Sequence, residues 1–248
     1  MSNKNFIYKE VDKEGLDVLN VIAAADKFNN WMYQTIKPFL KGNILEIGSG
    51  IGNITQCVIN DNFKVTASDI RDNYCAMLQD RFGENPYLNE IRNIDIVHPE
   101  FDNEYKDLFD KFDSIVALNI VEHVENDGLA IKNCKKLLRQ EGNLIILVPA
   151  YMGLYNQFDK ELEHFRRYTK STLEKIFIAA GLKINKTQYF NFIGILGWWF
   201  SGRILRKKTI PGGQMKLYNT LVPIFKLVDK VMLNKVGLSV ITFGTKNN

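Results

Sequence analysis

The feature that most constrains the fold is a glycine loop directly after a short apolar segment. Residues 44–47 form an apolar, β-prone segment, and glycine then occupies alternate positions at Gly48, Gly50 and Gly52. Glycine is required where the backbone adopts positive φ or where a ligand lies against it. Residues 51–59 are apolar and helix-like, and the first amides of a helix favour a negatively charged or polar group. The sequence therefore predicts a strand, a tight turn and a helix N-terminus that together bind a ligand.

The spacing after this loop indicates what kind of ligand it binds. A dinucleotide-binding fingerprint would place its third glycine where this chain has Asn53. A second predicted strand, 63–68, ends in Asp69 and Ile70. An acid about twenty residues after the glycines can accept hydrogen bonds from both hydroxyls of a ribose. Asp69 could also cap the predicted helix 71–82, and one aspartate can serve both roles.

Strand-like and helix-like segments alternate after this unit. Strands are predicted at 90–96, 112–119 and 144–149, and the unbroken apolar run of the last is typical of a parallel strand covered on both faces. Two further strands are predicted at 183–190 and 238–245. A helix after the fourth strand is predicted to reach Gln140, and a capping box from Ser171 is predicted to start a helix that runs to Ala180 and is stopped by Gly181. The length of 248 residues, with 46% apolar and 24% charged residues, suits one large globular domain. We predict an α/β fold with a doubly wound, mostly parallel sheet, whose carboxyl ends bind the ligand.

The pattern Glu-x-Gly-x-Gly-x-Gly over residues 46–52 resembles motif I of the class I S-adenosylmethionine-dependent methyltransferases. The resemblance extends over roughly residues 29–190. Residues 121–124, Val-Glu-His-Val, resemble the signature of a small-molecule subgroup of the methyltransferase type 11/12 kind, which includes quinone-pathway enzymes. The resemblance implies a Rossmann-like sheet of seven strands with an antiparallel last pair, and S-adenosylmethionine as the cofactor.

The resemblance also implies a set of cofactor-binding residues at the strand ends. The glycine loop would lie against the cofactor, Asp69 would bind the ribose, and Asp95 would face the adenine amino group with Ile96 against the ring. A segment before the glycine loop would close over the cofactor. The predicted set is Trp31, Tyr33, Glu46, Gly48, Ser49, Gly50, Gly52, Asn53, Asp69, Ile70, Asp95, Ile96, Asn119 and Ile120.

Two of these assignments have alternatives in the sequence itself. The two aromatic residues of the set also fit the core-facing stripe of a helix predicted over 16–40. Near Asp95, Asn93 and the 100–104 region offer further acidic or amide groups.

Methyl transfer from a sulfonium needs mainly proximity and alignment, with a general base where the nucleophile carries a proton of high pKa. His123 and His164 are the candidates, because imidazole titrates near neutrality, whereas His98 is expected to be structural. Residues 164–168, His-Phe-Arg-Arg-Tyr, resemble a stretch in bacterial methyltransferases of this subgroup, so Tyr168 joins the predicted catalytic set. The two arginines of this stretch could face either the substrate or water.

No metal site is predicted, because Glu122, Glu125 and Asp127 form no convincing set of acidic ligands after the fourth strand. Nucleic acid is not expected as a substrate. Amino-methyltransferases of nucleic acids carry Asn or Asp, two prolines and an aromatic residue after that strand, where this chain has Asn119-Ile120-Val121-Glu122.

The domain is predicted to span residues 1–248, with an N-terminal helical cap at 1–41 and a helical insertion at 191–236 before the last strand. The insertion is aromatic and basic, with Trp198 and Trp199 followed by several Lys and Arg residues. Residues 201–248 hold nine Lys or Arg and one Asp, although the whole chain is only +4. Such a segment can pack on its own domain, form a homodimer surface, or face anionic groups such as lipid headgroups.

We therefore expect a methyltransferase that acts on an O, N or C nucleophile of a small molecule. The alternatives are a lipid-linked or membrane-proximal acceptor, and a non-catalytic binding module with the same fold. The three cysteines, Cys57, Cys75 and Cys134, lack paired spacing and fit a cytoplasmic location. The N-terminus does not resemble a signal peptide. The longest apolar run, 192–200, is too short for a membrane span.

Overall fold

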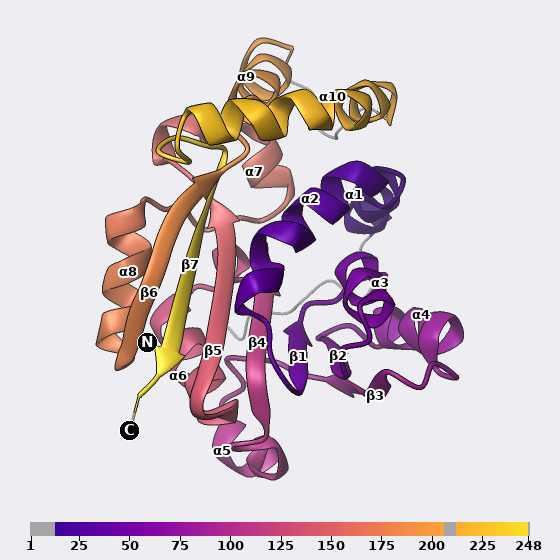
Figure 1. Cartoon of the computed structure of the whole chain (residues 1–248), viewed down its shortest axis with the longest axis vertical. Helices are drawn as coiled ribbons and strands as arrows, with labels where there is room; N and C mark the ends of the chain where they lie inside the picture. Colours follow the sequence, from indigo (N-terminus) through magenta and orange to yellow (C-terminus); the bar gives the residue numbers. More distant parts are fainter. Residues whose placement is uncertain (1–12, 206–211, 248) are drawn as a thin grey trace, which may run out of the picture.

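A mixed seven-stranded sheet organises the chain in the computed structural model, which describes residues 13–205 and 212–247 (Figure 1). The strands lie in the order β3-β2-β1-β4-β5-β7-β6. Their bounds are β1 Ile44–Ile47, β2 Val65–Asp69, β3 Leu88–Asn93, β4 Phe112–Leu118, β5 Leu138–Pro149, β6 Leu182–Phe190 and β7 Ser239–Lys246. The first five are parallel, and β7 runs antiparallel to both β5 and β6. The predicted fold class is confirmed.

Helices cover both faces of this sheet. Among the described residues they are α1 Lys13–Ala23, α2 Asp26–Ile36, α3 Asn53–Asn60, α4 Asp72–Phe82, α5 Phe101–Glu104, α6 Asp127–Leu137, α7 Gln157–Glu161, α8 Lys170–Ala179, α9 Gly194–Trp199 and α10 Gly212–Val231. Short single turns are η1 Lys37–Phe39, η2 Lys106–Leu108, η3 Val121–His123, η4 Met152–Leu154 and the π-turn η5 Phe200–Ile204. None of the described helices combines the length and apolarity needed to cross a bilayer.

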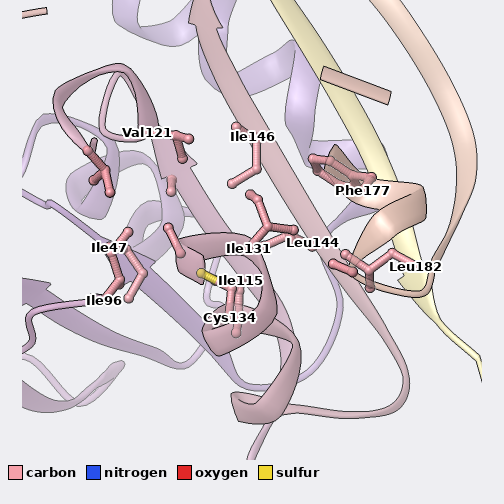
Figure 2. Packing of buried hydrophobic residues seen from close by; sticks show 14 of the residues in the cluster. Ile47, Ile96, Ile115, Val121, Ile131, Cys134, Leu144, Ile146, Phe177 and Leu182 are labelled. Carbon is pink, nitrogen blue, oxygen red and sulfur yellow. The ribbon is translucent and has the colours of Figure 1, made fainter. Parts of the chain in front are cut away.

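Alternating side chains of the central strands pack into two separate hydrophobic cores, one on each face of the sheet. In β5, Leu144 and Ile146 pack with α6 and α8, as Figure 2 shows around Ile131 and Phe177. Ile145 and Leu147 point to the opposite face, where α2, α3, α4 and α10 cover them. This burial on both faces explains the continuous apolar run of the strand.

The structure differs from the predicted elements at three places. The helix predicted over 16–40 is two helices, because the chain turns at Ala24 and Ala25, where the Asn29 side chain donates to the Ile22 carbonyl at 2.8 Å. The helix predicted to reach residue 140 ends at Leu137, since Leu138 already pairs with Phe112 of β4. Tertiary pairing overrides local helix propensity there.

The third difference concerns the start of α8. A capping box was expected to begin at Ser171, but the N-cap is Thr169, whose hydroxyl accepts from the Thr172 amide at 3.2 Å. The helix ends before Gly181, which adopts φ +75 as its predicted stop role requires.

The 191–236 segment contains α9, η5 and α10, which lie beyond the carboxyl end of β5 (Figure 1). Helix α10 packs across α2, where Asn219 accepts from the Phe28 amide at 3.0 Å and donates to Asp26 at 2.7 Å. Its inner face is buried through the side chains of Val222 and Phe225. Arg206, Lys207 and Lys208, which contribute to the predicted basic surface, lie outside the described residues, as do residues 1–12 of the predicted N-terminal cap.

Candidate active site

A cavity of about 460 Å³ lies at the carboxyl ends of the strands, under α1, α2, α9 and α10. A volume of this size suits a small-molecule ligand. Of the residues predicted from the sequence, those that line the cavity are Glu46, Gly48, Ser49, Gly50, Asn53, Asp69, Ile70, Asp95, Ile96, Asn119, Ile120, His123 and His164.

The glycine loop after β1 forms one wall of the cavity. All three glycines adopt positive φ, +72 at Gly48, +53 at Gly50 and +83 at Gly52. Gly52 does not line the cavity, however. A β-carbon there would lie 2.3 Å from the Phe82 ring, so this glycine allows α3 to pack closely against α4.

Asp69 connects this loop to the end of β2. Its Oδ2 accepts from the Gly50 amide at 3.0 Å, and its Oδ1 accepts from the Arg71 amide at 3.0 Å. The Ser49 amide also donates to the Ser68 carbonyl at 2.7 Å. Burial raises the pKa of Asp69, and the backbone donors partly offset that rise. The carboxylate is therefore fixed at the cavity wall with lone pairs left for further donors.

Glu46 is the buried acid at the base of the cavity. Its Oε2 accepts from the Thr55 hydroxyl of α3 at 2.5 Å. Burial raises the pKa of Glu46 to about 7, against the lowering effect of the Thr55 and Ser49 hydroxyls. The predicted helix start thus supplies a hydroxyl that holds the acid of the preceding strand.

The region expected to hold the adenine follows β3, which ends at Asn93. Asp95 and Ile96 therefore lie just after the strand rather than within it. The Asp95 amide donates to the Tyr105 hydroxyl at 3.0 Å, and the side-chain Oδ1 of Asp95 accepts from the Val97 amide at 2.9 Å. Asn119, at φ +57, turns the chain after β4 and brings Ile120 to the cavity.

Trp31 and Tyr33 do not line the cavity. Trp31 packs on Phe190, with ring centroids 4.4 Å apart, and both predicted residues belong to the core on the α2 face. The side chains of α2 that reach the cavity are Phe28, Asn29 and Met32. The sequence predicted an apolar stripe on this helix. Which of its side chains reach the cavity depends on how α2 packs under α10.

Three ionisable side chains of the cavity lining lie close together. Ligand-type atoms of Glu122, His123 and His164 all lie within 4.8 Å of one another. The two imidazole rings stand edge to face, with centroids 4.6 Å apart. Burial lowers the pKa of His123 to about 3, helped by His164 and Arg71, and burial raises the pKa of Glu122 to about 8. The chain thus gathers nitrogen and oxygen lone pairs beside the predicted cofactor region.

Asp159 and Arg167 hold His164 in place, and Asp159 was not among the residues predicted from the sequence. Asp159 Oδ1 accepts from His164 Nδ1 at 2.9 Å and from Arg167 Nε at 2.7 Å. Arg167 also donates to the Ala150 carbonyl at 3.0 Å and lies 4.7 Å from the Trp198 ring centroid. The sequence did contain a local indication that Asp159 has a structural role, because Asn156 and Asp159 have the spacing of a capping box and form one at the start of α7.

Tyr168 and Arg166 lie outside the cavity lining. The Tyr168 hydroxyl donates to Asp127 Oδ2 at 2.9 Å, and Arg166 pairs with the same carboxylate at 2.9 Å. Tyr168 is buried in the core on the α6 face. Both side chains therefore attach the loop that contains His164 to the start of α6.

Two packed aromatic side chains form part of the cavity wall. Phe158 of α7 and Trp198 of α9 line the cavity, and their ring centroids lie 5.0 Å apart. The predicted insertion thus contributes to the same cavity as the strand ends.

Comparison with known proteins places these features in a family. A family model described as a methyltransferase domain matches residues 23–187. A probable polyketide synthase of Dictyostelium discoideum is 26% identical over 145 residues, which cover 50% of this chain and 5% of that protein. An uncharacterized methyltransferase of Staphylococcus carnosus is 32% identical over 127 residues, or 49% of this chain and 55% of that protein. The chain thus spans only part of the length of these relatives.

A solved structure supports the same fold. Phosphoethanolamine N-methyltransferase 2 of Haemonchus contortus, in complex with S-adenosyl-L-methionine, superposes with a TM-score of 0.64 at 14% identity. The match covers 98% of this chain and 61% of that one.

Proposed function

Because this chain belongs to the methyltransferase domain family and has the class I fold, we propose that it is an S-adenosylmethionine-dependent methyltransferase of a small molecule. When bound, S-adenosylmethionine supplies an activated methyl group. We further propose a cytoplasmic location, supported by three cysteines that form no disulfide.

The observation that carries this proposal is that one cavity is lined by two chemically distinct groups of residues. The glycine loop and Asp69 form one group, and Glu122, His123 and His164 form the other. The first group offers a backbone without side chains and a fixed carboxylate, which suit a ribose and an extended ligand. The second group offers nitrogen and oxygen lone pairs, which suit a methyl acceptor that has to lose a proton.

The residues of the chain have separable roles in this proposal. Asp69 and the loop position the cofactor, and Asp95, Ile96 and Ile120 enclose its base. Phe158 and Trp198 exclude water and contact apolar parts of the acceptor. Such positioning supplies most of the rate enhancement when the donor is already activated.

The test is titration of the purified protein with S-adenosylmethionine and S-adenosylhomocysteine by calorimetry, with Asp69→Ala as the variant. Loss of a charged hydrogen-bond acceptor is expected to weaken binding about 10- to 100-fold. Transfer of labelled methyl groups to a panel of small acceptors would follow. A folded wild-type protein that binds neither ligand would contradict the proposal, and binding without transfer to any acceptor would favour a binding module.

A lipid-linked or membrane-proximal acceptor is the second candidate, and a specific surface favours it. Exposed apolar side chains gather on α9, η5 and α10, among them Leu196, Trp199, Phe200, Leu217, Ile224, Leu227 and Val231. These helices also line the cavity through Trp198, Gln214 and Tyr218. Exposed apolar and basic groups on one element suit an anionic lipid surface.

Vesicles distinguish the two candidates. Co-sedimentation with vesicles of anionic lipid, and its loss in Trp199→Ser/Phe200→Ser, would support the membrane-proximal acceptor. The control is Ile178→Ser, which removes an apolar residue of α8 that is even more exposed. Concentration-dependent dimerisation abolished by the double substitution, without vesicle binding, would instead assign the surface to a homodimer.

A further inference from the structure

The side chain of Glu122 is buried without a hydrogen-bond partner. It is fully buried, and neither carboxylate oxygen has a partner among the described residues. Its position is firmly held, because its backbone carbonyl accepts from the Phe165 amide at 2.8 Å. A buried carboxylate is costly unless it is paired or coordinates a metal. Arg167 interacts electrostatically with Glu122 and lowers its pKa, but the hydrogen bonds of its guanidinium go to Asp159 and the Ala150 carbonyl.

Two imidazole rings complete a set of three donors with this carboxylate. The donor atoms of Glu122, His123 and His164 lie within 4.8 Å of one another. Donors of one tetrahedral ion at about 2.1 Å stand about 3.4 Å apart. Side-chain rotations that close the widest pair by at most about 1.4 Å would therefore bring all three into coordination distance.

A hydrogen bond to its outer ring nitrogen already orients His164. Asp159 can only accept, so His164 Nδ1 carries the proton and the lone pair is on Nε2. The His123 ring stands edge to face with this oriented ring, with centroids 4.6 Å apart. Metal-binding histidines usually donate their second N–H to a carboxylate or a backbone carbonyl in this way.

We propose that Glu122, His123 and His164 bind a divalent transition-metal cation such as Zn²⁺, which holds the methyl acceptor by a hydroxyl oxygen. Two imidazoles and one carboxylate form a donor set that suits such cations, and three protein ligands leave a coordination position open toward the cavity. The cation site stands on its own geometry, whereas its role toward the acceptor rests on the proposed methyl transfer.

The cation would activate the acceptor as follows. Coordination lowers the pKa of the acceptor hydroxyl, whose proton passes to solvent water. An oxygen lone pair then forms the bond to the methyl carbon, and the carbon–sulfur bond breaks with its electron pair on sulfur. The products are a methyl ether, S-adenosylhomocysteine and one proton, so no oxidant or further reactant is needed.

The direct test uses untagged full-length protein that has been treated with a chelator and desalted. Titration with Zn²⁺ by calorimetry is expected to show one equivalent bound per chain. Titration with Co²⁺ is expected to give visible absorption of nitrogen and oxygen ligation without a thiolate charge-transfer band. The absence of that band would separate this site from Cys57, Cys75 and Cys134.

Variants assign the binding to these residues. Glu122→Gln and His164→Ala are each expected to weaken Zn²⁺ binding at least about 10-fold, and Asp159→Asn about 10- to 100-fold through the orientation of His164. His98→Ala is the matched control, because His98 does not line the cavity and its Nδ1 accepts from the Glu100 amide at 3.2 Å. Circular dichroism establishes that each variant is folded.

Two outcomes would overturn the cation site. One is a folded wild-type protein with no saturable Zn²⁺ binding, and the other is unchanged affinity in the His123→Ala/His164→Ala variant. Titration of the same samples with S-adenosylmethionine keeps the two proposals separate. A protein that binds S-adenosylmethionine but not Zn²⁺ would refute only the cation site. A protein that binds Zn²⁺ but not S-adenosylmethionine would refute the proposed methyl transfer.

Discussion

A β-carbon placed on Gly48 would lie 2.0 Å from Cδ1 of Ile120, so the loop after β1 and the turn after β4 meet with no room for one methyl group. Gly48 also adopts φ +72, a conformation that side chains disfavour. We expect Gly48→Ala to lower the free energy of unfolding by about 2–4 kcal/mol, from the clash and the backbone strain together. Urea denaturation measures this change.

Two further variants separate the clash from the strain. Gly153→Ala is the control, because a β-carbon there meets nothing within 4 Å. In a double-mutant cycle, Ile120→Ala should be less destabilising in the Gly48→Ala background than in the wild type, because it then also relieves the clash. Equal stability of Gly48→Ala and the wild type would contradict the packing described here.

The two adjacent arginines of the 164–168 stretch are expected to differ strongly in their contribution to stability. Arg167→Met leaves the buried carboxylate of Asp159 without its guanidinium, and we expect a loss of about 3–5 kcal/mol. Arg166→Met breaks a partly exposed pair with Asp127, and we expect a loss below about 1 kcal/mol. Chemical denaturation of both variants measures the difference, and similar losses would show that Asp159 does not depend on Arg167.

The buried acid of β1 should make stability depend on pH. The pKa of Glu46 is raised to about 7 in the folded state from an ordinary value of 4.5. Between these values the folded state keeps a proton that the unfolded chain has lost. The free energy of unfolding should therefore fall as pH rises through this window, by up to about 3 kcal/mol from this group.

Substitution isolates this contribution. In Glu46→Gln the group no longer titrates, so its denaturation midpoint should fall less between about pH 4.5 and about pH 7 than that of the wild type. Glu84→Gln, which removes an exposed carboxyl, is the control and should follow the wild type. Parallel pH profiles for Glu46→Gln and the wild type would refute this assignment.

Asp229 should control how firmly α10 is attached to the sheet. It is buried at the end of α10 and accepts from the amides of Asn191 and Phe192 at 2.6 and 2.8 Å. In Asp229→Ala these amides lose their acceptor, and we expect faster hydrogen exchange there and in α10, with global unfolding about 1–3 kcal/mol easier.

The control for Asp229 is Asp26→Ala. Asp26 is exposed, and its carboxylate accepts from the Asn219 side chain of α10 at 2.7 Å. Its loss should change exchange in α10 much less. Unchanged exchange in Asp229→Ala, measured by mass spectrometry, would mean that apolar packing alone attaches the helix.

Local patterns were sufficient to predict much of the fold and the part of the cavity lining that lies at the strand ends. Neighbours in the sequence were enough to predict the continuous burial of β5, the positive φ of Gly48 and the position of Asp69. Because parallel strands end at one edge of a sheet, correct strand assignments placed Asp69, Asp95 and Asn119 around one cavity.

Predictions failed for residues whose contacts come from a segment distant in the sequence. Gly52 was assigned to the ligand, but its missing side chain makes room for Phe82 of α4. Tyr168 was assigned to the substrate, but its hydroxyl bonds Asp127, which lies 41 positions earlier in the chain. In both cases the residue type was informative, and its partner was not visible in the local pattern.

The sequence by itself determined the sheet, its glycine loop and the acid that follows, since side-chain periodicity and backbone conformation are short-range properties. Only the tertiary structure decided that Phe28 and Met32 of α2 reach the cavity while Trp31 faces the core. It also decided that Asp159 orients His164 beside Glu122, because the loop after β5 folds back onto the turn after β4. Contacts between separate segments depend on how their surfaces pack, and no local pattern encodes that choice.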